Sequence, residues 1–151
     1  MLKWIDIPPV WLLAALALAW AQARWWPMGL GFGAGPVPDL LAGLLVGGGL
    51  LLVALAAVEF RRAHTTLLPH ETPSALVTTG IYSRSRNPIY LADLLILAGF
   101  VLYWDAVPSL ALVPALLWVL ERRFVLPEEK RMRRTFRAEF ARYERKVRRW
   151  I

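Results

Sequence analysis

The chain has 151 residues, about the length of one domain, and combines 58% hydrophobic residues with a formal net charge of +7. So high a hydrophobic content excludes an intrinsically disordered chain. The absence of cysteine excludes a disulfide scaffold, a thiolate metal site and a cysteine nucleophile. The only histidines, His64 and His70, are too few for a histidine-rich metal centre, so we expect no metal site.

The charge is distributed unevenly along the chain. Residues 1–120 hold six basic and six acidic residues and are neutral overall, whereas residues 121–151 hold twelve basic and five acidic residues. The tail therefore carries the whole excess of +7, and the sequence predicts a neutral apolar body followed by a cationic tail.

The apolar body predicts a polytopic all-α membrane protein, because about 20 apolar residues of helix span a bilayer. We predict four membrane helices, over residues 8–26, 39–58, 88–103 and 107–123. For the first, a cleaved signal peptide is the alternative, since Ala21-Gln22-Ala23 resembles a cleavage site, but the weakly charged N-terminus favours a retained helix. A soluble bundle is disfavoured, because this body has too little polar surface to cover itself in water.

Basic residues indicate the orientation. The predicted loop over residues 59–87 holds four arginines and the tail holds twelve basic residues, so the positive-inside rule places this loop and both termini in the cytoplasm. The short, Ala-, Leu- and Arg-rich chain suggests a prokaryotic inner membrane. Small residues in the second span allow close helix packing and leave oligomerisation open. These are Gly43, Gly47, Gly48 and Gly49.

The tail predicts one amphipathic helix over residues 127–149. Pro127 suits a helix start, and Glu128 and Glu129 suit its first turn. Apolar residues then recur at helical spacing on one face, while the other faces are rich in arginine. They are Met132, Phe136, Phe140, Tyr143, Val147 and Trp150. We expect an interfacial helix that binds anionic membrane lipids, and no nucleic acid, because the tail directly follows a membrane span.

Polar and aromatic residues crowd the segment between the second and third spans. Gly80 allows a tight turn, and Asn87-Pro88 predicts a helix N-terminus, which is a favourable place for an anion. Arg86 beside it has the geometry to clamp a carboxylate or phosphate. The alternative is that Arg84 and Arg86 only anchor the third span at lipid headgroups, and the residues alone leave the two open.

Two ordered motifs in this region resemble the integral membrane methyltransferases, the group of the isoprenylcysteine carboxyl methyltransferases and the phospholipid N-methyltransferases. The first is Gly80-Ile81-Tyr82 followed by Ser85-Arg86-Asn87-Pro88-Ile89-Tyr90, which is similar to the signature G-x-Y-x-x-x-R-[HN]-P-x-Y. The second is Leu126-Pro127-Glu128-Glu129, then Phe136, Glu139-Phe140, Tyr143 and Val147. The resemblance covers residues 59–151.

The resemblance implies S-adenosyl-L-methionine as cofactor. Glu128 and Glu129 would bind its ammonium group, Arg86 its carboxylate, and Tyr82 and Tyr90 would offer ring faces to adenine or to the sulfonium. A helix N-terminal preference for acids is the alternative for the two glutamates. The implied catalytic residues are Arg86 and Glu129, and the implied cofactor-binding residues are Gly80, Tyr82, Arg86, Asn87, Pro88, Tyr90, Glu128 and Glu129.

We therefore expect a methyltransferase that acts on a lipid or a prenylated small molecule or peptide, like the isoprenylcysteine carboxyl methyltransferases. A phospholipid amine N-methyltransferase, a non-catalytic membrane adaptor of the same fold and a small transporter subunit are the alternatives. Asn87 replaces the histidine of eukaryotic carboxyl methyltransferases, and Phe140 replaces a tyrosine of the pattern, so the acceptor stays open. Asp93, an acid inside the third span, is expected to be paired, to orient the substrate or to act as a base.

Overall fold

The structure is a computed structural model that describes residues 6–33, 35–65, 71 and 73–151, so His70 lies outside the described residues. The described residues form helices and no strand, which confirms the predicted all-α class. The helices are α1 (Pro8–Trp25), α2 (Pro36–Arg62), α3 (Pro88–Tyr103), α4 (Leu112–Leu120) and α5 (Leu126–Lys146). Short helical turns lie at Gly80–Ser83, Val107–Ala111 and Glu121–Val125.

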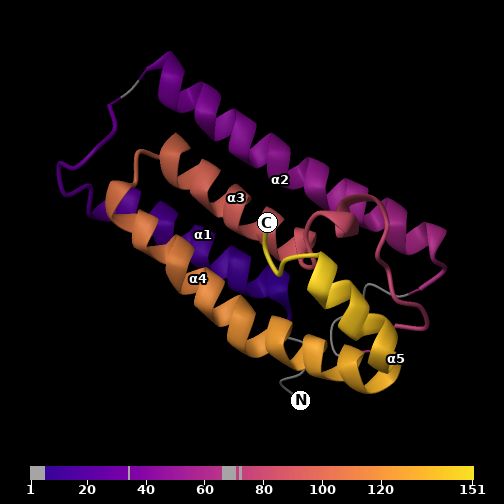
Figure 1. Ribbon diagram of the computed structural model, residues 1–151. Coiled ribbons are helices and arrows are strands. Elements are labelled where there is room, and N and C mark those ends of the chain that lie inside the picture. Colours follow the sequence, from indigo (N-terminus) through magenta and orange to yellow (C-terminus); the bar gives the residue numbers. More distant parts are fainter. Residues whose placement is uncertain (1–5, 34, 66–70, 72) are drawn as a thin grey trace.

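Helix α3 lies at the centre of the bundle (Figure 1). It packs along α2 on one side and against α1 and α4 on the other. The main core forms on the second side, where α3 contributes Leu97 and Val101, and α4 contributes Leu120, each without solvent exposure. Helix α1 adds Ala19 to this core, and the side chain of Ser109 donates a hydrogen bond to Gln22 at its end (2.8 Å). The first predicted span is therefore an integral part of the bundle.

One helix of the described chain, α2, is long and apolar enough to cross a membrane by itself. Most of its residues are not covered by the rest of the protein, as expected for a helix that faces lipid. Helix α3 is apolar but has only 16 residues. The structure therefore supports one of the four predicted spans by length and composition, and the other three stay predictions.

A glycine sets the close approach of α2 and α3. A Cβ added at Gly49 would lie 2.9 Å from the carbonyl oxygen of Ala92 and 2.7 Å from the side chain of Ile96, so no larger residue fits there. The other three glycines that we predicted as packing residues of this span have no neighbouring atoms within 4 Å of an added Cβ. Only Gly49 of that group therefore serves helix packing inside the protein.

The prediction of one continuous helix over residues 127–149 is wrong in its continuity and in its end. The backbone of Arg137 is non-helical (φ 41°, ψ −110°), so α5 consists of two helical arms that meet at a sharp bend, and it ends at Lys146. Figure 1 shows the second arm turning back toward the start of α3. The apolar stripe is used inside the protein: Phe140, Tyr143 and Val147 are buried and pack with Leu76. Helical periodicity alone did not reveal this bend.

Candidate functional site

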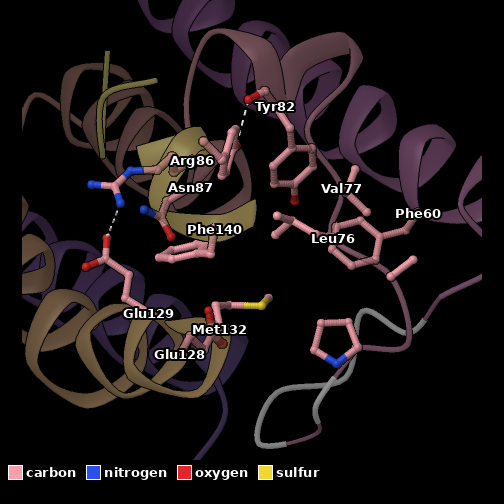
Figure 2. Close-up of a pocket in the computed structure, with 13 residues that line it drawn as sticks. Phe60, Leu76, Val77, Tyr82, Arg86, Asn87, Glu128, Glu129, Met132 and Phe140 are labelled. Atoms are coloured by element: carbon pink, nitrogen blue, oxygen red, sulfur yellow. Dashed lines mark hydrogen bonds and ion pairs between the residues drawn. The ribbon is translucent and has the colours of Figure 1, made fainter. Parts of the chain in front are cut away.

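The bend in α5 closes a cavity at the polar end of the bundle (Figure 2). The cavity has a volume of about 60 Å³ and is open on one side. This is several times the space of about 10–15 Å³ that one water molecule requires. It accommodates a small charged or polar group, and a larger ligand would extend through the mouth. The lining residues come from the end of α2, the loop that follows it, the start of α3 and both arms of α5. They are Phe60, Pro73, Ala75, Leu76, Val77, Tyr82, Arg86, Asn87, Glu128, Glu129, Met132, Phe140 and Tyr143.

Gly80 shapes the turn that brings Tyr82 to the cavity. Its φ of +57° suits glycine, and an added Cβ would lie 2.5 Å from the carboxyl carbon of Glu59. Glu59 is buried, and its carboxylate accepts a hydrogen bond from the hydroxyl of Thr79 at 2.6 Å. Gly80 is not among the residues that line the cavity. Its role is to let the turn pack directly on α2.

Two tyrosines form the inner wall of the cavity. The hydroxyl of Tyr143 donates a hydrogen bond to the carbonyl oxygen of Tyr82 at 2.6 Å, which ties the second arm of α5 to the turn (Figure 2). The ring of Phe60 packs edge-on against Tyr82. Burial raises the pKa of both tyrosine hydroxyls well above the usual value. Both phenols are therefore protonated near neutral pH, and they serve as donors and ring faces rather than bases.

Arg86 presents an unpaired donor in a buried position. Its side chain is 10% exposed, and its Nη1 contacts Glu129 and Glu144 at 3.3 Å each. Its Nε has no hydrogen-bond partner among the described residues. A buried donor without an acceptor is costly, so this atom fits a ligand that brings an acceptor such as a carboxylate.

The two adjacent glutamates of α5 have different surroundings. Glu128 lines the cavity, and its Oε1 accepts a hydrogen bond from the hydroxyl of Tyr90 at 2.7 Å. Glu129 is 4% exposed, and its carboxylate contacts Arg86 at 3.3 Å, Arg133 at 3.4 Å and Arg149 at 2.9 Å. Three guanidinium groups thus already compensate the charge of Glu129.

A further carboxylate extends this ion-pair network. Glu144, on the second arm of α5, accepts hydrogen bonds from Arg133 on the first arm and from Arg86. The hydrogen bond from Arg133 and the neighbouring positive charges hold the pKa of the Glu144 carboxyl below its ordinary value of 4.5. These ion pairs hold the two arms together across the bend at Arg137.

Five of the predicted site residues line this one cavity: Tyr82, Arg86, Asn87, Glu128 and Glu129. Tyr90 lies behind Glu128, and Pro88 is buried in the first turn of α3. Asp93 does not line the cavity; it is buried within α3, and its Oδ2 has no partner in the described part of the chain. His64 also lies outside the cavity wall.

The sequence did not reveal several residues of the site. The sequence placed Phe60 in the loop after the second span, and Met132 and Phe140 on the apolar face of the tail, with Phe140 also in the second motif. It placed Arg133, Glu144 and Arg149 in the charged tail. Their roles depend on the bend in α5, which brings distant parts of the tail together. The one available signal was the clustering of acids at Glu128 and Glu129 in an otherwise basic segment.

The residues of the cavity fit a ligand that carries both a negatively and a positively charged group. Arg86 Nε offers a donor for an anionic group, Glu128 offers a carboxylate for a cationic group, and aromatic rings stand between them. S-adenosylmethionine combines a carboxylate, an ammonium and a sulfonium, so the residues present fit this cofactor. A cation beside an aromatic ring gains about 0.5–2 kcal/mol.

Comparison with known proteins agrees with this chemistry. The phospholipid methyltransferase family matches residues 38–139, which include α2, α3, α4 and the first arm of α5. No curated protein and no solved structure matches the chain. The family match spans more than half of the chain and includes most of the cavity wall. The chain therefore belongs to the phospholipid methyltransferase family.

Proposed function

We propose that this protein is an S-adenosylmethionine-dependent methyltransferase that methylates a lipid acceptor at the cytoplasmic face of the membrane. The proposal is supported by the cavity that Arg86 and Glu128 line together, and by the buried Nε of Arg86, which has no hydrogen-bond partner among the described residues. Both residues lie inside the segment that matches the family.

Each residue has a role that follows from its surroundings. Arg86 holds the cofactor carboxylate, and Glu128 stabilises the ammonium or the sulfonium. Glu129, already paired with three arginines, holds Arg86 in place rather than binding a further cation. When bound, S-adenosylmethionine supplies an electrophilic methyl group, whose bond to sulfur breaks as its bond to the acceptor forms. The residues of the cavity accelerate this step by aligning the partners and excluding water.

The acceptor is a lipid that reaches the site from the bilayer. Helix α2 exposes apolar side chains along its length, and Phe60 in its last turn is part of the cavity wall, so it leads from the membrane to the site. The family match favours a phospholipid over a prenylated peptide. A carboxylate acceptor needs no base, whereas an amine acceptor must first lose a proton.

The outer surface of the tail suits anionic lipid headgroups. Exposed basic side chains with no ion pair among the described residues cover α5 and the turn before it. They are Arg122, Lys130, Arg134, Arg137, Arg142, Arg145, Lys146 and Arg148. Such clusters are attracted to the cytoplasmic leaflet, with about 1 kcal/mol for each basic residue near the surface. This attraction supports our proposal that the polar end of the bundle lies at the cytoplasmic face.

Calorimetric titration of the purified protein with S-adenosylhomocysteine, the demethylated product of the cofactor, tests the proposal. We expect binding that Glu128→Gln weakens, because it removes the carboxylate from the cavity. Glu139→Gln is the matched control, since Glu139 is an exposed acid of the same helix outside the cavity wall. Absence of binding to the wild type would instead indicate a non-catalytic adaptor of the same fold.

A further inference from the structure

The last residues of the chain run along the segment that precedes α3. The backbone N–H of Arg86 donates a hydrogen bond to the carbonyl of Arg148 at 3.1 Å. The side-chain amide of Asn87 donates to the carbonyl of Arg149 at 3.0 Å, and the hydroxyl of Ser85 lies 3.5 Å from the same oxygen. The chain end is thus attached to the residues that carry the first motif.

The side chain of Arg149 reaches the opposite wall of the site. Its Nε and Nη2 contact the two oxygens of Glu129 at 3.0 and 2.9 Å, and its Nη1 contacts Glu121 at 2.6 Å. Arg149 itself does not line the cavity, whereas Glu129 and Asn87 do. It also lies after the residues 38–139 that match the family.

We propose that Arg149 is a positioning residue that fixes Glu129 through its guanidinium group and Asn87 through its carbonyl. The proposal rests on the proposed function, because it assigns Arg149 a role in cofactor affinity. The guanidinium group of arginine has several N–H groups in a planar fork, so it contacts both oxygens of Glu129 and Glu121 at the same time. The ammonium group of a lysine is a single charged nitrogen and cannot make all three contacts. Without this fork, Glu129 keeps only Arg86 and Arg133 as partners, and the donor geometry of Arg86 is no longer defined.

The test compares Arg149→Ala, Arg149→Lys and the control Arg142→Ala in the full-length protein. Arg142 is an exposed arginine of the same arm with no ion pair among the described residues. The dissociation constant for S-adenosylhomocysteine is measured by calorimetry well below each variant's unfolding temperature, so that folded proteins are compared. We expect Arg149→Ala to weaken binding about tenfold or more, as for the loss of a charged hydrogen bond. Arg149→Lys should recover part of this loss, and Arg142→Ala should stay within about twofold.

A double variant separates positioning from general stability. If Arg149 acts mainly through Glu129, Arg149→Ala should weaken binding much less in a Glu129→Gln background than in the wild type. Wild-type binding within about twofold in both Arg149 variants would overturn the proposal while leaving the proposed function intact. If Arg149→Ala does not fold, the comparison of Arg149→Lys with the wild type alone tests the proposal: weaker binding supports it, and binding within about twofold overturns it. Absence of binding to the wild type would overturn the proposed function, and this proposal with it.

Discussion

Replacing Gly80 by alanine tests how the turn before α3 is held in place. Alanine in a left-handed conformation costs about 1–2 kcal/mol. The lower entropy of the unfolded chain offsets about 0.4–1 kcal/mol of this. In addition, the new Cβ would lie 2.5 Å from the carboxyl carbon of Glu59, so this carboxyl must shift, and we expect it to lose its hydrogen bond with Thr79. Losing this charged hydrogen bond costs about 1.5–3 kcal/mol. The sum is about 1.5–4.6 kcal/mol, or a fall in Tm of about 3–18 °C for a chain of this size.

Gly29 provides the matched control for this substitution. Its φ is +64°, close to the +57° of Gly80, but an added Cβ would have no neighbour within 4 Å. Gly29→Ala therefore carries the backbone cost alone, about 1 kcal/mol. Both variants are compared with the wild type by thermal unfolding in detergent, followed by tryptophan fluorescence. Equal shifts in Tm would contradict this prediction, because the contact with Glu59 would then contribute nothing.

Three further predictions concern α5. Arg137→Gly should raise Tm by about 2–4 °C, because glycine adopts the φ of 41° without the backbone strain that arginine has there. Arg142→Gly, within the second arm, should lower Tm. A lower Tm for Arg137→Gly would contradict the bend. Tyr143→Phe should cost about 1–2 kcal/mol in chemical denaturation, because it leaves the carbonyl of Tyr82 without its partner, and an unchanged midpoint would argue against that hydrogen bond. Because the pKa of Glu144 is lowered in the folded protein, its carboxylate stabilises the folded state. This stabilisation is fully present at pH values above 4.5, the ordinary pKa of the group, and is lost as the pH falls below it. The fall in Tm on acidification should therefore be shallower in Glu144→Gln, and parallel curves for the two proteins would exclude this contribution.

The sequence predicted the elements of the fold better than their arrangement. Uninterrupted apolar runs gave the positions of α2 and α3 within a few residues, because hydrophobic segments of that length have few alternatives to a helix. The tail shows the limit of this reasoning. Arg137 interrupts neither the charge pattern nor the apolar period, and the tertiary contacts of Phe140 and Tyr143 hold the bend. Periodicity therefore could not distinguish one long helix from two helical arms that meet at a bend.

The site was predictable where the motif residues are adjacent in sequence. Arg86 and Asn87 meet Glu128 and Glu129 because α3 and α4 form a hairpin that returns the chain to the same end of the bundle. The difference between Glu128 and Glu129 was not predictable, since both are acids in one helical turn. It depends on Arg149, twenty residues after Glu129, whose guanidinium contacts both carboxylate oxygens of Glu129 once the chain has turned back.

Transfer of a labelled methyl group from S-adenosylmethionine into membrane lipids is the direct test of whether this protein methylates a lipid. The purified protein is placed in vesicles that contain phospholipids of defined headgroups, and the lipid fraction is separated by headgroup class. We expect label in a lipid fraction with the wild type and with Glu139→Gln, and a strong reduction with Glu128→Gln. Absence of label with the wild type in every lipid class, or equal incorporation by Glu128→Gln, would contradict it.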